Sequence, residues 1–133
     1  MHLGAPRTIR TERGQFAYRE AGPSGGTPVV MIHGWPESSY CWNKVVGYLE
    51  PDLHVIAPDL RGLGDSERTR GTEPYLKHNL AQDVLSVLDA LDVQDFQLVG
   101  HDWGGVVAQE MALARPGQVT RMAILNIAII NNL

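Results

Sequence analysis

Short apolar runs alternate with stretches of helical periodicity along most of this chain, and this alternation is the feature that most constrains its fold. The runs are apolar at consecutive positions, which is typical of strands covered on both faces. We expect such strands at residues 28–32, 53–57, 96–99 and 122–130.

Segments with helical spacing lie between these runs, and a proline follows or opens each of them. In the longest segment leucine and valine recur at helical intervals, so these side chains are expected to form core rather than a binding stripe. The expected helices cover residues 38–49, 74–91 and 104–115, and the prolines are Pro51, Pro74 and Pro116.

Residues 7–20 alternate loosely around Gly14 and predict a β-hairpin ahead of these units. Strands that alternate with helices imply a parallel sheet with covered faces. The predicted fold class is therefore α/β, with a mostly parallel sheet, an N-terminal antiparallel hairpin and helices on both faces. A length of 133 residues suits one domain with one core.

Composition narrows the range of partners and settings. The net charge of -4 provides no basic surface for nucleic acid or for an anionic membrane. The apolar stretches are too short to cross a membrane, and the N-terminus lacks the apolar segment of a signal peptide. Cys41 is the single cysteine, which excludes an intrachain disulfide and a multi-cysteine zinc cluster. We expect a reduced, cytoplasmic setting, no metal and no cofactor.

Three of the predicted strands end in polar or glycine-rich segments, at the sheet edge where α/β proteins place their ligands. The third of these segments has the pattern Gly-x-Asp-x-Gly between a strand and a helix, which is typical of a nucleophile elbow with aspartate as the nucleophile. The alternative is an aspartate that only caps the helix. The segment consists of Gly100, His101, Asp102, Trp103, Gly104 and Gly105.

A second motif follows the first buried strand and consists of His33, Gly34, Trp35 and Pro36. At this position we expect the backbone N–H of Trp35 to converge with that of Trp103 on one oxygen, as an oxyanion hole. A cis peptide bond before Pro36 would suit so tight a turn. The alternative is an ordinary turn that ends a strand.

Together these motifs resemble the epoxide hydrolase branch of the α/β-hydrolases. The resemblance covers the chain from about Arg7 onward and includes the segment 58–66 and Leu125-Asn126. It implies that Asp102 attacks an epoxide or alkyl halide to form an alkyl-enzyme ester, with Trp35 and Trp103 at the substrate. It also implies a catalytic histidine, its acid partner and cap-domain tyrosines, which come later in such proteins.

The resemblance does not assign the role of the catalytic histidine or of the cap-domain tyrosines to any histidine or tyrosine of this chain. We expect the histidines and tyrosines to be structural, packed or solvated, and the charged pair in the loop after the second buried strand to be structural as well. These residues are His2, His33, His54, His78, His101, Tyr18, Tyr40, Tyr48, Tyr75, Asp59 and Arg61.

Residues 1–133 are therefore expected to form a partial α/β-hydrolase core without a cap or C-terminal strands. The apolar run at 122–130 would then be an unpaired sheet edge, which predicts a homo-oligomer or a complementing C-terminal chain. Three functions stay open: an epoxide-hydrolase-like enzyme, a haloalkane or haloacetate dehalogenase-like enzyme, and a non-catalytic module that assembles through this edge.

Overall fold

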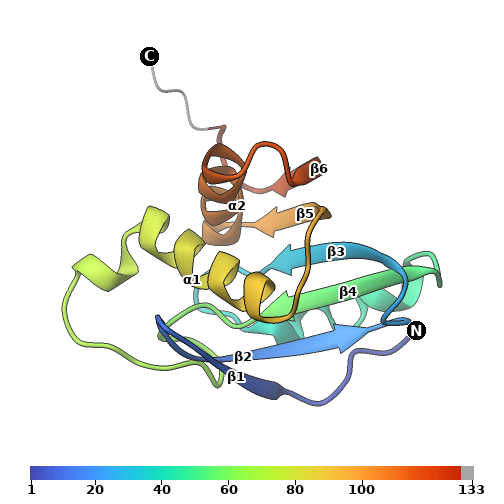
Figure 1. The fold of residues 1–133 in the computed structure, drawn as a ribbon, viewed down its shortest axis with the longest axis horizontal. Coiled ribbons are helices and arrows are strands. Elements are labelled where there is room, and N and C mark those ends of the chain that lie inside the picture. Colours follow the sequence, from blue (N-terminus) through green and yellow to red (C-terminus); the bar gives the residue numbers. More distant parts are fainter. Residues whose placement is uncertain (130–133) are drawn as a thin grey trace.

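The computed structural model describes residues 1–129, in which one sheet is covered on both faces (Figure 1). The sheet has the strand order β1-β2-β4-β3-β5-β6. Its strands are β1 (Arg7–Thr11), β2 (Gly14–Ala21), β3 (Thr27–Ile32), β4 (Leu53–Pro58), β5 (Phe96–His101) and β6 (Val119–Leu125). The helices are α1 (Lys77–Ala90) and α2 (Trp103–Ala114), with 3₁₀ helices η1 (Ser39–Trp42), η2 (Val45–Tyr48) and η3 (Glu73–Tyr75).

The strand directions confirm the predicted α/β class. β1 and β2 form the antiparallel hairpin, and β2 also pairs antiparallel with β4. β3 runs parallel to both β4 and β5, and β5 runs parallel to β6. The carboxyl ends of β3, β4 and β5 therefore lie at one edge of the sheet, where the loops that follow them meet.

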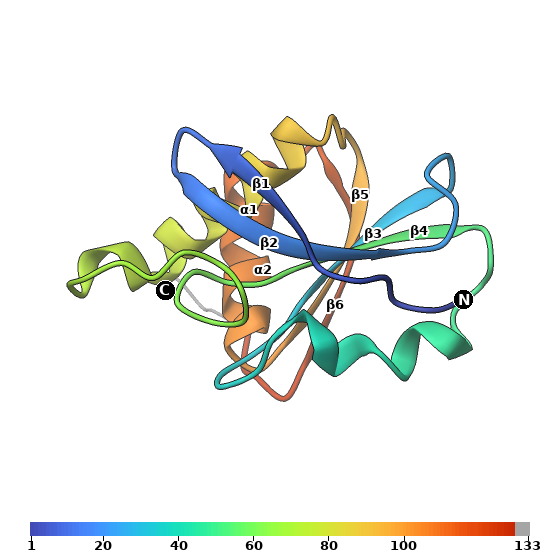
Figure 2. The ribbon, with the colours of Figure 1, turned by 90° about the horizontal axis from the view of Figure 1, so that it is seen from below.

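The core lies in two layers, one on each face of the sheet. α1 and α2 pack over one face, where their apolar side chains enclose Val30, Ile56 and Leu98. On the other face η1 and η2 contribute Trp42 and Val46 to a smaller cluster (Figure 2, teal segment). Alternate strand residues thus enter opposite clusters, which explains why the strands are apolar at consecutive positions.

The predicted helix at residues 38–49 is replaced by two 3₁₀ turns. Asn43 N–H donates to the Tyr40 carbonyl at 3.0 Å and Gly47 N–H donates to that of Lys44 at 3.2 Å, which are i→i+3 bonds. Two β-branched valines followed by a glycine have low helix propensity, and this favours short turns over a continuous α-helix. The prediction of an α-helix here was wrong, although the segment does cover the sheet.

The predicted helix at residues 74–91 is interrupted near its start. Residues 73–75 form η3, and Leu76 is extended with φ −61° and ψ 142°, so the α-helix begins at Lys77. The Leu76 side chain is partly exposed rather than core, whereas Leu80, Val84 and Leu88 are buried as predicted.

The last predicted strand is shifted along the chain. β6 begins at Val119 rather than residue 122 and ends at Leu125, where Asn126 adopts φ 59° and turns the backbone. Ile130, the last residue of the predicted strand, lies outside the described residues. β6 pairs with β5 on one side, and no described strand pairs with its other edge.

Candidate active site

Asp102 lies in the tight turn between β5 and α2, with φ 56° and ψ −128°. A positive φ is costly for a residue with a side chain, and such conformations collect at functional sites. Gly100 allows this turn, because a Cβ at that position would collide with the backbone of Gly104 and Gly105. The strand, the turn and the helix are thus where the Gly-x-Asp-x-Gly pattern predicts them.

Two backbone N–H groups hold the Asp102 carboxylate. Trp35 N–H donates to Asp102 Oδ2 at 3.0 Å, across 67 residues of sequence. Hydrogen bonds from the Trp103 N–H and then the Trp35 N–H are the largest causes that lower the pKa of Asp102, with smaller contributions from the charges of His101 and Lys77. These bonds stabilise the charged form, so Asp102 is ionised at neutral pH.

The loop after β3 approaches Asp102 closely, and Gly34 makes this approach possible. A Cβ at Gly34 would collide with the Asp102 side chain and the His101 carbonyl. The Trp35–Pro36 peptide bond is cis, which confirms the expectation from sequence. The Trp35 N–H therefore reaches the carboxylate because the residue before it has no side chain.

His33 supports this loop from the core. Its Nε2 accepts from the Leu60 N–H at 3.0 Å, and its Nδ1 lies 2.8 Å from the Gly34 carbonyl. One ring nitrogen accepts and the other donates in this arrangement, as in a neutral ring. Burial lowers the pKa of His33, which is consistent with that form and with the predicted structural role.

Glu37 joins the two motifs, and its role was missed from the sequence. Its Oε1 accepts from the Gly34 N–H at 3.1 Å and lies 3.1 Å from His101 Nδ1. The His101 ring is therefore directed to Glu37, as expected for a side chain that is not hydrogen-bonded to Asp102. The only sequence signal was the position of a carboxylate directly after Pro36.

Asp59 and Arg61 hold the loop after β4 and do not contact Asp102. Asp59 Oδ1 accepts from the Ser39 N–H at 2.7 Å, and its Oδ2 accepts from the Asp65 N–H at 2.9 Å. Arg61 donates to both oxygens of Asp83 on α1, at 2.8 and 3.0 Å. The predicted structural role of this pair agrees with these contacts.

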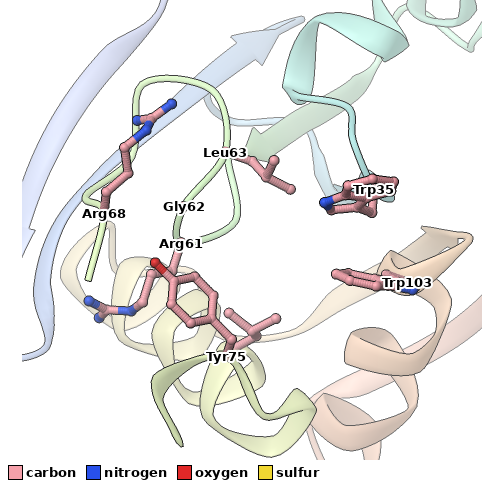
Figure 3. A pocket seen from close by; sticks show the side chains of 8 residues that line it. Trp35, Arg61, Gly62, Leu63, Arg68, Tyr75 and Trp103 are labelled. Atoms are coloured by element: carbon pink, nitrogen blue, oxygen red, sulfur yellow. The ribbon is translucent and has the colours of Figure 1, made fainter. Parts of the chain in front are cut away.

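A cavity of about 380 Å³ lies beside the two tryptophans (Figure 3). The rings of Trp35 and Trp103 lie 5.7 Å apart at an interplanar angle of 34°, and both are exposed. Tyr75 forms another wall, but its hydroxyl donates to the Thr69 carbonyl at 2.7 Å and accepts from the Thr69 N–H at 2.9 Å. Tyr75 is thus a wall of the cavity rather than a free proton donor. The complete lining is Trp35, Arg61, Gly62, Leu63, Arg68, Tyr75, Leu80 and Trp103.

No imidazole is hydrogen-bonded to Asp102 among the described residues. His54 on β4 contacts Glu20, while His2 and His78 are exposed. Within residues 1–129 no group of three His, Cys, Asp or Glu side chains is arranged to bind a metal ion. In the same range there is no helix with the length and apolar character needed to cross a bilayer.

Comparison with known proteins identifies the fold family. The sequence matches the family model for the α/β hydrolase fold over residues 27–132, and the chain belongs to this family. It is 35% identical to epoxide hydrolase A of Mycobacterium tuberculosis over 128 residues, which cover 94% of this chain and 40% of that protein.

Solved structures agree with this assignment. An epoxide hydrolase from Vigna radiata superposes with a TM-score of 0.88 at 29% identity, over 97% of this chain and 42% of that one. A haloalkane dehalogenase loop variant from Bradyrhizobium elkanii superposes with a TM-score of 0.86 at 31% identity, over 96% and 41% of the two chains. The chain is therefore an epoxide-hydrolase-like member of the family that spans about 40% of the length of these relatives.

Proposed function

We propose that Asp102 is the nucleophile of an epoxide-hydrolase-like site and that it forms an alkyl-enzyme ester with the substrate. The observation that carries this proposal is the pair of backbone N–H groups, from Trp103 and Trp35, on the carboxylate of a residue in a strained turn. A residue that only capped the helix would accept a hydrogen bond from the N–H two or three residues further on, and the Asp102 side chain makes no such cap.

In the first step an Asp102 oxygen attacks an sp³ carbon of the epoxide. A bond forms between this oxygen and the carbon, the carbon–oxygen bond of the ring breaks, and the ring oxygen takes up a proton from solvent. The nucleophile needs no general base because it is already ionised. With Oδ2 engaged by the Trp35 N–H, Oδ1 is the oxygen that we assign to the attack.

In the second step water attacks the carbonyl carbon of the ester, and negative charge develops on the oxygen that accepts from the Trp35 N–H, to which we also assign the Trp103 N–H as a donor. Donors aimed at such an oxygen typically contribute about 3–4 kcal/mol each to the transition state. Trp35 and Trp103 thus act twice, through their backbone as the oxyanion hole and through their rings as a wall for the substrate. This step also needs a general base, and we assign it to a residue outside those that the structure describes.

Intact-mass spectrometry with three probes tests the proposal. We expect styrene oxide to add its whole mass to the chain once, since nothing leaves when an epoxide opens. The D102N variant, which preserves the shape of the side chain, should gain no such mass. Equal addition to D102N would contradict the proposal, provided that circular dichroism shows the same fold in both proteins.

The same experiment distinguishes a dehalogenase, which the similarity to the B. elkanii enzyme favours as the second candidate. An alkyl halide would add its alkyl group and release halide. Haloalkane dehalogenases typically have Asn where Trp35 stands, and haloacetate dehalogenases have Arg where Trp103 stands, so we expect 1-bromobutane and bromoacetate to react more slowly than styrene oxide.

The third candidate is a module that assembles through β6 without turnover. It is favoured by the exposed apolar side chains near that strand, namely Leu113, Met122, Leu125 and Ile129. We propose that this surface binds a second copy or a complementing chain. A folded chain that associates but gains no mass from any of the three probes would favour this candidate.

A further inference from the structure

The cavity beside the tryptophans combines apolar walls with cationic groups. Its walls include Leu63, Leu80 and the rings of Trp35, Tyr75 and Trp103, and its lining contains no described Asp or Glu side chain. The chain as a whole carries a net charge of -4, so this concentration of positive charge is opposite in sign to the average surface. Whether each cation can attract an anionic ligand depends on how far nearby carboxylates compensate its charge.

Arg61 contributes little free charge to the cavity. Its guanidinium donates to both oxygens of the buried Asp83 carboxylate and lies 3.3 Å from Glu67. These carboxylates compensate its charge, so Arg61 is a structural part of the wall.

Arg68 has a different environment. Its described hydrogen bonds, both at 3.1 Å, go to the backbone carbonyls of Ser66 and Gly64, which carry no net charge. No described carboxylate forms an ion pair with it, and the residue is exposed. Figure 3 shows Arg68 on the far side of the cavity from Trp35 and Trp103. Arg68 therefore lines the cavity with a guanidinium that is held by carbonyls of its own loop and is not compensated by a described carboxylate.

Lys77 adds a second cation near Asp102, and its charge also stabilises the Asp102 carboxylate. Its Nζ lies 4.0 Å from the centre of the Trp103 ring, and it forms no ion pair with a described carboxylate. The ring keeps the ammonium group beside the mouth of the cavity through a cation–π contact. The positive potential therefore extends from Arg68 to the residue next to Asp102.

We propose that this cavity selects substrates that combine an apolar body with a carboxylate, and that Arg68 binds the carboxylate while Lys77 reinforces the attraction. The apolar body lies against the tryptophans and Leu63, which places the reacting carbon near Asp102 and the carboxylate at the opposite end. The reaction of such a substrate rests on the proposed function of Asp102, whereas its binding to the cavity does not. Arg68 is a specificity residue here, because it does not touch the reacting atoms.

Paired ligands that differ only in charge test the binding. Isothermal titration calorimetry compares 3-phenylpropanoate with 3-phenylpropanamide, neither of which can react with Asp102. We expect the carboxylate to bind about tenfold more tightly at low salt, and the difference to shrink as salt screens the charges. The R68Q variant should lose most of the preference and K77M a smaller part, whereas R68K should retain it.

Matched controls separate this effect from a general change of surface charge. Arg70 lies two residues from Arg68 but does not line the cavity, and Lys44 lies on the opposite face of the sheet. R70Q and K44M should leave the preference unchanged. Equal affinities for the two ligands in the wild-type chain, or an equal preference in R68Q, would overturn the inference.

A reactive pair with the same difference in charge connects binding to the reaction. 4-(Oxiran-2-yl)benzoate and 4-(oxiran-2-yl)benzamide carry the epoxide at the end of an aromatic body opposite the carboxylate or the amide, and we expect the first to modify Asp102 about tenfold faster at low concentration. Tight binding of the carboxylate without any adduct would leave the anion site standing and reject the nucleophile. Equal adduct rates with equal affinities would reject the anion site and leave Asp102 as the nucleophile.

Discussion

Asp102 is held by main-chain geometry, and in the proposed reaction the oxygen that accepts from the Trp35 N–H stays fixed while the other attacks the substrate. The donors come from two loops, and Gly34 allows them to approach because it has no side chain. Because the donors are backbone N–H groups, a site of this kind depends on the conformation of the two loops more than on the side chains that they carry. Its reactivity should follow the ionisation of one carboxyl group.

The pH dependence of alkylation tests this ionisation. The hydrogen bonds from the Trp103 and Trp35 N–H groups lower the pKa of Asp102, so the reactive carboxylate persists below the ordinary range of aspartate. We expect the rate of adduct formation to stay constant from about pH 8 to about pH 5 and to fall only as the pH approaches the lowered pKa. A rate that already falls between pH 7 and pH 5 would show that the pKa is raised instead.

Glu37 is a positioning residue, and the E37Q variant tests it. Loss of the carboxylate weakens the bond from the Gly34 N–H and the contact with His101, so Trp35 should hold Asp102 less firmly. We expect alkylation about fivefold slower and a loss of about 1–2 kcal/mol in unfolding free energy.

Two comparisons separate positioning from stability alone in this variant. The NMR amide signals of Trp35 and Trp103 should shift in E37Q, and E37D should restore part of the rate. E50Q, which changes an exposed carboxylate, should alter neither the tryptophan amide signals nor the alkylation rate. Unchanged tryptophan amides and an unchanged rate in E37Q would contradict this role.

At the residue level the sequence predicts Asp102, Trp35 and Trp103 because each lies in a motif with fixed spacing. It does not predict Glu37, because the contact with His101 joins residues 64 positions apart and depends on how two loops meet. The wall formed by Tyr75 was missed for the same reason, since it follows from the break before α1.

At the level of elements, α1 is tied to the loop after β4 by the buried pair of Arg61 and Asp83. Arg13 from the β1–β2 turn also donates to Asp83, at 2.8 Å. Three segments therefore share one carboxylate, and this arrangement fixes the cavity wall that Gly62 and Leu63 form. Such a carboxylate stabilises the fold only while its partners are present.

Substitution of the buried Asp83 should lower the unfolding free energy far more than substitution of the exposed Asp89. D83N removes the buried carboxylate that faces the charged, buried Arg61 and leaves it only the more exposed Glu67, so we expect a loss of about 3–5 kcal/mol in unfolding free energy. D89N breaks the exposed pair with Arg115 and should cost at most about 1 kcal/mol. Chemical denaturation measures both, and equal costs would show that the buried pair does not hold the loop.

Long, strongly periodic elements were predictable, and short ones were less so. The first three buried strands and α2 appear close to the predicted positions because a covered parallel sheet needs continuous apolar runs, whereas β6 is shifted along the chain. Residues 38–49 were predicted as one helix ended by Pro51, but i→i+3 turns bury Trp42 and Val46 without a continuous helix. Periodicity alone does not distinguish these alternatives.

For the whole molecule the decisive feature is the free edge of β6. Within residues 1–129 the strand pairs with β5 alone, and Met122 and Leu125 beside this edge are partly exposed. The chain spans about 40% of the length of relatives that share its fold. An apolar edge of this kind favours pairing with another polypeptide.

Analytical ultracentrifugation of the M122K variant tests the association. A charge on β6 opposes the burial of this surface, so we expect the wild-type chain to associate at high concentration and M122K to remain monomeric. Y48K places the same charge at an exposed aromatic residue on the opposite face and should behave as the wild type. A wild-type chain that stays monomeric at high concentration would contradict this account of the edge.

The most direct test of the central claim is to locate the adduct by peptide mapping. After exposure to excess styrene oxide at neutral pH, we predict one equivalent of ester on Asp102 that persists in this polypeptide, because no described imidazole lies against the carboxylate. Modification that maps mainly to other residues, or that is the same in D102N, would show that Asp102 is not the nucleophile.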